Sequence, residues 1–173
     1  NTTEQNTVMK SLEKIVDGSI IQKDKNFYLK VKGSGEFEMG LVSEGYRKLS
    51  TIMYLILSGS LSKNAILFWD EPETNMNPKM IKPLVDAVIE LAKMGVQVFI
   101  TTHDYFVQQC FNIAASYQKN DKKKLQYNFM SLYRDDRAII CESSDSLLQL
   151  EHNAIMDEFD ALYDREQGLI YGN

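Results

Sequence analysis

The chain has 173 residues, of which 44% are hydrophobic and 25% are charged, enough for one globular domain with a buried core. Its formal charge of −5 excludes a surface that is basic throughout, as a general nucleic-acid binder would need, but a local basic patch stays possible. No apolar run approaches the ~20 residues of a membrane-spanning helix, and the first residues lack the pattern of a signal peptide. The two cysteines, Cys110 and Cys141, lie among apolar residues without metal-type spacing. We therefore expect buried thiols and a cytoplasmic protein that does not enter the membrane.

The first forty residues predict a helix and a hairpin. Apolar residues at helical spacing indicate an amphipathic helix over 4–17. Two β-type segments, 19–24 and 27–32, follow with a short polar break between them and predict an antiparallel pair. The glycine-rich stretch 33–40 predicts a turn with a short strand.

The middle of the chain alternates helices and strands. Apolar residues recur every three or four positions from Ser43 to Leu57, and 65–69 is a continuous apolar run typical of a strand covered on both faces. A helix from Pro78 to near Gly95 and a second apolar strand over 96–102 follow, and Asp104 begins a further helix. This order predicts an α/β fold with a mainly parallel sheet flanked by helices.

Two prolines and an asparagine shape the helix that starts at Pro78. Asn77 suits the position that caps a helix, and Pro78 suits its first turn. Pro83 falls inside this predicted helix, so we expect a kink there.

The last third predicts an antiparallel pair, 127–134 with 138–143, and then two helical pieces. From Glu142 to Glu166 there are eight carboxylates against one basic residue, so an acidic amphipathic helix packed on the rest of the domain is the interpretation. Its apolar stripe is Ile155, Phe159, Leu162 and Tyr163. A metal-dependent Toprim nuclease is disfavoured, because only some seventy residues follow His103 and that domain needs about a hundred. The basic run 119–124 is typical of a solvated loop.

Polar residues gather at the carboxyl ends of the two apolar strands, where α/β proteins place their chemistry. Asp70 and Glu71 end the first strand, and His103 follows the second. A carboxylate held at a strand end can orient Mg²⁺ through its waters, and a second carboxylate can polarise an attacking water. An imidazole there can donate a hydrogen bond to a phosphate oxygen. The alternative for each is structural: a core strand that ends in a solvated acidic turn, and a histidine satisfied by its surroundings.

A third element stands at the start of the helix after Ser43. The stretch Ser43-Glu44-Gly45 combines a capping residue with a glycine that permits close approach of the backbone. A helix N-terminus attracts anions, because its amides are unpaired and its dipole is positive there. Serine and glycine before a helix are also common for purely structural reasons.

Together these elements resemble the head of an ABC-type ATPase, most closely the stand-alone AAA-family ATP-binding proteins of prokaryotes. That group includes relatives of the overcoming-lysogenisation-defect proteins and ATPases of anti-phage defence. The stretch VSEGYRK resembles the signature motif, ILFWDE the Walker B strand, PETNMNP the D-loop and ITTHD the switch loop. The resemblance implies that Asp70 lies beside Mg²⁺, Glu71 is the catalytic base and His103 senses the γ-phosphate. Ser43, Glu44, Gly45 and Asn77 would contact nucleotide. Asn77 stands where the group's usual loop has histidine.

The sequence contains no G-x-x-x-x-G-K-[ST] loop to hold the phosphates of ATP. We therefore expect one C-terminal lobe over 1–173, with a helix and hairpin (1–40), a motif core (41–118) and a hairpin with an acidic tail (119–173). The resemblance implies as partners a P-loop lobe, a second head and a separate effector, with nucleic acid possible. The expected function is ATP hydrolysis that switches an effector, and the resemblance implies a role in anti-phage defence. The alternatives are a non-hydrolysing assembly module and a head for DNA repair or chromosome structure.

Overall fold

The computed structural model describes residues 3–23, 26–118 and 124–172. The chain divides into two compact units, Asn1–Thr102 and His103–Asn173. In the first unit the elements are α1 (Thr3–Val16), β1 (Gly18–Lys23), β2 (Asn26–Val31), β3 (Gly35–Glu38), the 3₁₀ turn η1 (Met39–Leu41), α2 (Glu44–Leu57), β4 (Ile66–Asp70), the 3₁₀ turn η2 (Pro78–Met80), α3 (Ile81–Met94) and β5 (Gln97–Thr101). In the second they are α4 (Tyr105–Ser116), β6 (Phe129–Asp135), β7 (Ala138–Ser144), the 3₁₀ turn η3 (Leu147–Gln149) and α5 (Ala154–Tyr171).

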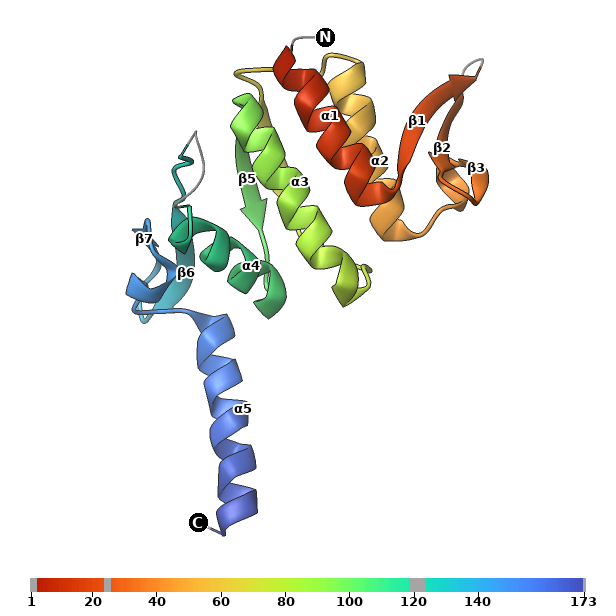
Figure 1. The fold of residues 1–173 in the computed structure, drawn as a ribbon. Coiled ribbons are helices and arrows are strands. Elements are labelled where there is room, and N and C mark those ends of the chain that lie inside the picture. The colour runs from red at the N-terminus through yellow and green to blue at the C-terminus, as the bar shows by residue number, and fades with distance from the viewer. Residues whose placement is uncertain (1–2, 24–25, 119–123, 173) are drawn as a thin grey trace. The chain divides into compact units, whose positions relative to one another are not determined.

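The three helices of the first unit bury its core between them. Figure 1 shows α1 beside both α2 and α3, and one fully buried leucine comes from each: Leu12, Leu49 and Leu91. Each helix is amphipathic, so burial of its apolar side stabilises the packing more than helix propensity does. The predicted helix over 4–17 is thereby confirmed as α1.

An antiparallel sheet of β1, β2 and β3 adjoins these helices. Gly18 pairs with Val31 and Lys23 with Asn26, which confirms the predicted hairpin, while residues 24–25 of its turn lie outside the described residues. A Cβ on Gly18 would lie 2.5 Å from the carbonyl oxygen of Lys30, so only glycine fits at this point. The glycine-rich stretch forms the expected short strand, β3, which pairs with β2.

Local signals in the sequence set the ends of α3. The Asn77 side chain accepts a hydrogen bond from the Lys79 amide at 3.0 Å, and Gly95 ends the helix with φ 98°. The predicted kink at Pro83 is wrong in its premise. Because η2 occupies 78–80, α3 begins at Ile81 and Pro83 stands in its first turn, where the missing amide breaks no helical bond.

β4 and β5 form a parallel pair in the predicted order, and among the described residues of the first unit one face of the pair is covered. Ile66 pairs with Gln97 and Asp70 with Thr101. Leu67, Trp69 and Val98 pack against the core.

The expectation that this strand is covered on both faces is wrong within the described residues of the first unit. On the outer face Ile66 is 57%, Phe68 75% and Phe99 39% exposed. The rings of Phe68 and Phe99 stack with centroids 4.8 Å apart and planes at 13°. The alternation of burial along both strands is typical of a sheet with one solvated face.

The expectation of a mainly parallel sheet is also corrected. Among the described residues β4 and β5 form the parallel sheet, whereas β1-β2-β3 and β6-β7 are antiparallel. Local hairpin signals on both sides of the helix–strand segment account for this mixture, since a short connection between neighbouring strands favours antiparallel pairing.

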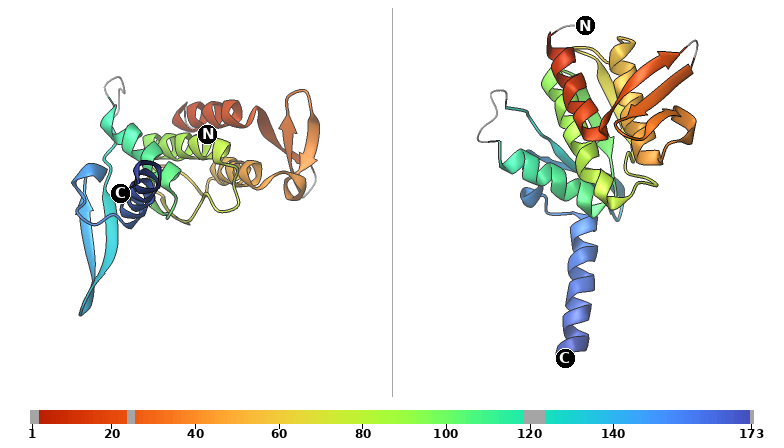
Figure 2. Two further views of the ribbon diagram at one scale, coloured as in Figure 1. Left: turned by 90° about the horizontal axis from the view of Figure 1, so that it is seen from below. Right: turned by 45° about the vertical axis from the view of Figure 1, so that its right-hand side comes forward.

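The second unit joins α4 to a hairpin and a long helix. Asp104 caps α4 by accepting a hydrogen bond from the Val107 amide at 2.8 Å. The predicted antiparallel pair is confirmed as β6 and β7, which pair from Phe129 with Ser144 to Asp135 with Ala138; Figure 2 shows this hairpin in its left view. Residues 119–123, most of the basic run, lie outside the described residues.

The predicted acidic helix is α5, preceded by η3. Its cap is Asn153, whose side chain accepts hydrogen bonds from the Met156 amide at 3.3 Å and from Gln108 at 2.9 Å. Within the second unit Phe159, Leu162 and Tyr163 are exposed, although Phe159 stacks on Tyr105 with centroids 4.3 Å apart. Packing of this stripe on the rest of the domain stays a prediction. Amphipathic spacing predicts the helix, but it does not show which part of the protein packs on its apolar side.

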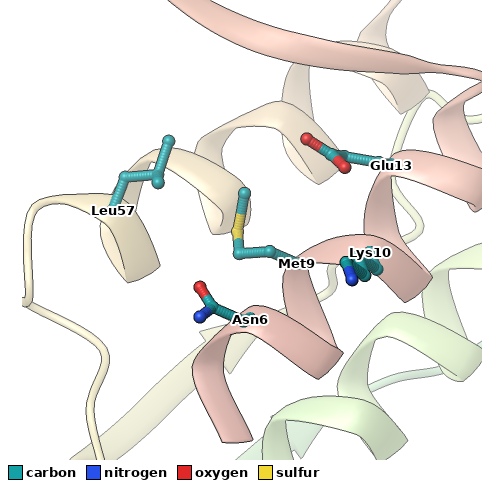
Figure 3. A pocket seen from close by; sticks show the side chains of 5 residues that line it. All are labelled: Asn6, Met9, Lys10, Glu13 and Leu57. Atoms are coloured by element: carbon teal, nitrogen blue, oxygen red, sulfur yellow. The ribbon is translucent and has the colours of Figure 1, made fainter. Parts of the chain in front are cut away.

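A hollow of about 300 Å³ lies on the first unit, between α1 and the end of α2 (Figure 3). The residues that line it are Asn6, Met9, Lys10, Glu13 and Leu57, and none of them is a site residue predicted from the sequence.

Cys141 is exposed and Cys110 is half-buried, which corrects the expectation of two buried thiols. Within the ranges described, no helix is long and apolar enough to cross a membrane.

Candidate functional site

Asp70 lies at the carboxyl end of β4, as predicted, and β5 holds its side chain. The register places Thr101 directly beside it, and the Thr101 hydroxyl donates a hydrogen bond to Asp70 Oδ1. The carboxylate is exposed at the edge of the sheet. It is therefore oriented by a neighbouring strand and still open to a ligand.

Glu71 turns the chain away from the strand in an unusual conformation. Its φ of 41° is in the left-handed region, which costs a non-glycine residue free energy and is concentrated at functional sites. Two bonds to Thr101 hold this turn: the Glu71 amide donates to the Thr101 carbonyl at 3.1 Å and to its hydroxyl at 3.2 Å. The Thr74 hydroxyl donates to Glu71 Oε2 at 3.3 Å. The second carboxylate thus has a defined position next to the first.

Glu73 anchors the turn to β5 from inside the protein. The side chain is only 8% exposed, and the Thr102 hydroxyl donates a hydrogen bond to its Oε1. Oε2 is buried with no hydrogen-bond partner among the described residues. The turn closes with the Thr74 amide bonded to the Glu71 carbonyl at 3.1 Å and the Met76 amide to that of Glu73 at 2.9 Å. Glu73 was not predicted as part of the site from the sequence. The feature that could have indicated it is a third acidic residue directly after the end of a strand.

Lys48 on α2 reaches the same turn from the opposite direction. Its Nζ donates hydrogen bonds to the carbonyls of Pro72 and Thr74, both at 2.7 Å. Lys48 is not among the site residues predicted from the sequence. A lysine inside the signature-like stretch was visible, but its partner lies 24 residues later, and no local spacing indicates such a contact.

Gly45 packs against the segment that follows the turn. It is buried, and a Cβ there would lie 3.2 Å from both Met76 Cε and Met80 Cγ. Close approach of the backbone, as expected from the sequence, is therefore required here by two methionine side chains of the same unit. Packing within this unit therefore explains the glycine at position 45, in addition to the nucleotide contact that the resemblance implies.

Ser43 and Glu44 begin α2 as predicted, but one expected bond is absent. Ser43 stands at the capping position and its side chain makes no capping hydrogen bond, so that expectation is wrong. The Arg47 amide bonds instead to the Ser43 carbonyl at 2.9 Å, and the exposed Ser43 hydroxyl faces solvent. Glu44 pairs with Arg47 one turn later, which offsets its charge at the positive end of the helix.

Asn77 and His103 are the remaining site residues predicted from the sequence. Asn77 uses its side-chain oxygen to cap η2, so it has a structural role at the position expected to contact nucleotide. His103 is exposed and opens the second unit, two residues after β5 ends at Thr101. The nucleotide contact of Asn77 and the phosphate contact of His103 both stay predictions.

The acids fit the way in which Mg²⁺ is bound in phosphate-transfer sites. Among residues 3–23, 26–118 and 124–172 no group of three or more His, Cys, Asp or Glu side chains could hold a metal ion alone. Mg²⁺ keeps several waters and uses one or two carboxylates plus substrate phosphates, so such a cage is not needed. The exposed Asp70 carboxylate beside the Thr101 hydroxyl supplies suitable oxygen ligands.

The sequence comparison decides the family. Residues 4–107, more than half of the chain, match the family described as "AAA domain, putative AbiEii toxin, Type IV TA system". The chain belongs to this AAA-domain family. Every site residue of the first unit, from Ser43 to Thr102, lies inside the matched segment. No curated protein matches the sequence.

Solved structures show the same fold in SMC heads. A SmcHead bound to the C-winged helix domain of ScpA has a TM-score of 0.58 at 14% identity, with 83% of this chain and 42% of that chain covered. A Smc head domain with an extended coiled coil, bound to the C-terminal domain of ScpA and derived from Pyrococcus furiosus, has a TM-score of 0.56 at 12% identity. The match covers 92% of this chain and 37% of that chain. A chain from a study of ATP-driven dimerization and DNA-stimulated activation of SMC ATPases has a TM-score of 0.56 at 10% identity. The match covers 94% of this chain and 92% of that chain. The chain therefore spans under half of two of these relatives and shares the fold of these SMC head structures.

Proposed function

We propose that this chain is the C-terminal lobe of an ABC-type ATPase head that hydrolyses ATP to ADP and phosphate. The observation that carries the proposal is the arrangement at the end of β4. Asp70 is oriented by Thr101 of the paired strand, and Glu71 is held beside it in a left-handed turn. An adjacent pair of carboxylates in two different local environments suits two different tasks.

In this mechanism the residues have separate roles. Asp70 would hold Mg²⁺, which would supply positive charge against the charge that develops on the phosphates. Glu71 accepts a proton from the attacking water as the water oxygen bonds to the γ-phosphorus and the bond to the β,γ-bridging oxygen breaks. His103 is proposed, from the resemblance alone, to donate a hydrogen bond to a γ-phosphate oxygen, and Asn77 to contact nucleotide.

A P-loop lobe is the partner that the bare face of the β4–β5 sheet supports. Parallel strands are almost always covered on both faces, and Ile66, Phe68 and Phe99 are left exposed. Two SMC head relatives are more than twice as long as the matched region. We propose that the segment with the phosphate-binding loop packs on this face and completes the site next to Asp70.

A second head and an effector are proposed as further partners. Ser43, Glu44 and Gly45 would present the start of α2 to nucleotide held by the partner head, because the Ser43 hydroxyl is exposed. The related SMC structures concern ATP-driven dimerization and a bound ScpA domain, which supports a head dimer with a protein partner. The family's description as a toxin–antitoxin component supports a defence role in which ATP hydrolysis switches a separate effector in the cytoplasm.

The test is a Glu71→Gln variant of the full-length protein. Removing a general base lowers the rate by about 10²- to 10⁴-fold, while ATP still binds and holds the heads together. Steady-state phosphate release and light scattering with ATP measure the two properties. Glu158→Gln, an exposed carboxylate on α5, is the matched control and should hydrolyse ATP at the rate of the unmodified protein.

The opposite outcome favours an assembly module that does not hydrolyse ATP. If Glu71→Gln and the unmodified protein release phosphate at the same rate and bind partner protein equally well, the proposed role of Glu71 is wrong. A variant that neither hydrolyses ATP nor dimerises with it would show that Glu71 acts in binding instead.

A further inference from the structure

Lys48 connects the helix that begins at Ser43 to the turn that carries Glu71. Its ammonium group donates to the carbonyls of Pro72 and Thr74, at 2.7 Å each, and so spans the residue between them. A lysine ammonium has three donors and is usually solvated. Here the half-buried side chain directs two of them to one short stretch of backbone. We call Lys48, Pro72 and Thr74 the lysine clamp.

The clamp holds a backbone that would otherwise relax. Glu71 and Asn75 both have positive φ, 41° and 61°, and such residues persist only where the surroundings over-determine them. Thr101 at the end of β5 and Thr102 directly after it hold one side of the turn, and α2 holds the other through Lys48. Without the clamp, the stretch between Pro72 and Thr74 loses its attachment to α2.

Two hydrogen bonds separate Lys48 from the Glu71 carboxylate. Lys48 bonds to the Thr74 carbonyl, and the hydroxyl of the same threonine donates to Glu71 Oε2 at 3.3 Å. A shift of Thr74 therefore moves the group that orients the carboxylate. A misplacement of about 1 Å at a reacting group can cost about 10²-fold in rate.

The other end of the connection is the start of α2. Lys48 lies one turn after Gly45, and Gly45 packs on Met76 and Met80 directly after the turn. The first turn of α2 and residues 72–80 are thus joined twice, by a charged clamp and by close packing. A packed interface of this kind transmits displacement instead of absorbing it.

We propose that Lys48 is a positioning residue that sets Glu71 for hydrolysis and makes its position depend on the start of α2. The inference rests on the proposed function, in which Ser43 and Gly45 face the nucleotide of a second head. Engagement of that nucleotide would then adjust the base of this head through Lys48. Lys48 contacts neither ATP nor the attacking water in this scheme.

The test compares three variants of the full-length protein. Lys48→Met removes the donors and keeps the length of the side chain, Lys48→Arg keeps donors, and Lys82→Met is the control. Lys82 is an exposed lysine on α3 whose ion pair with Asp86 at 2.5 Å lies outside the clamp. We expect Lys48→Met to lower kcat by about tenfold to a hundredfold with KM for ATP within about twofold. Lys48→Arg should recover part of kcat, and Lys82→Met should match the unmodified protein.

A second pair of measurements separates positioning from loss of folding. Amide hydrogen exchange at Thr74 and Met76 should be faster in Lys48→Met, with exchange in the core of α3 unchanged. Thr74→Val removes the hydroxyl that reaches Glu71 and leaves the carbonyl that Lys48 binds. Because both changes break one connection, the double variant should be little slower than Lys48→Met alone.

The outcomes against the inference are distinct from those against the proposed function. Unchanged kcat in Lys48→Met, additive effects of the two changes, or a loss of kcat that is accompanied by global unfolding and not restored by arginine would overturn the role of Lys48. Failure of Glu71→Gln to stop hydrolysis would overturn the proposed function. The exchange at Thr74 and Met76 would still decide whether Lys48 holds the turn.

Discussion

Replacing Phe68 by alanine tests whether the bare face of the β4–β5 sheet is covered in the complete protein. Phe68 is at the centre of β4, 75% exposed, and stacks on Phe99. A phenylalanine so exposed contributes little to the stability of this chain. The same residue would be a core residue if a P-loop lobe packs on it.

The two cases differ by a measurable free energy. A buried phenylalanine removes about 150–250 Å² from water, and about a quarter of that area is removed here. At about 25 cal/mol per Å², Phe68→Ala should reduce the free energy of unfolding of this chain by about 1 kcal/mol. In a complete head with the face covered, the cost should rise to about 3–5 kcal/mol, the usual range for phenylalanine in a core.

Urea unfolding of the 173-residue chain alone, and of the same chain completed by the proposed P-loop lobe, measures this difference. Leu49→Ala is the control, because Leu49 is fully buried by this chain and should cost about 2–5 kcal/mol in both proteins. If Phe68→Ala costs about 1 kcal/mol in both, no lobe covers this face and the argument for it is wrong.

Two further predictions concern a glycine and a carboxylate. Gly45→Val should lower the free energy of unfolding by about 1–3 kcal/mol, because its Cβ would lie 3.2 Å from Met76 and Met80 atoms; a chemical denaturation curve that matches the unmodified chain would contradict this packing role. The amide of Glu151, and then that of His152, lower the pKa of the Glu142 carboxyl from 4.5 by donating to it. A lowered pKa in the folded state stabilises the second unit above pH 4.5, and this stabilisation is lost as the pH falls through the folded value. Thermal unfolding between pH 6 and 3 should therefore depend on pH less steeply in Glu142→Gln, and equal slopes would exclude the contribution.

Local patterns predicted most of the elements because their causes are local. Asn77 before Pro78, Gly95 after an apolar helix and Asp104 before α4 each act within a few residues, through capping bonds or a left-handed φ. The same holds for the hairpins, whose strands are close in the chain. The error at Pro83 also has a local cause. The first three residues of the predicted helix form a 3₁₀ turn, so Pro83 lies in the first turn of α3 and not in its interior.

Part of the site could also be predicted. Parallel pairing of two strands joined by a helix brings Asp70 and Thr101 to one edge, and the structure has this register. The left-handed turn at Glu71 could not be predicted, because the bonds that stabilise it come from Thr101, thirty residues later. Lys48 was missed for the same reason, since its partners are carbonyl groups, which have no signature in the sequence.

The sequence by itself determined which segments form helices and strands, which polar residues follow the two central strands and which family they resemble. These features depend on periodicity, capping and residue type, which act over one or two turns. The tertiary structure alone decided which face of β4 and β5 is left bare and how Glu71 is held. Both depend on contacts between residues far apart in the chain, and the free energy of such contacts is set by packing that no local pattern encodes.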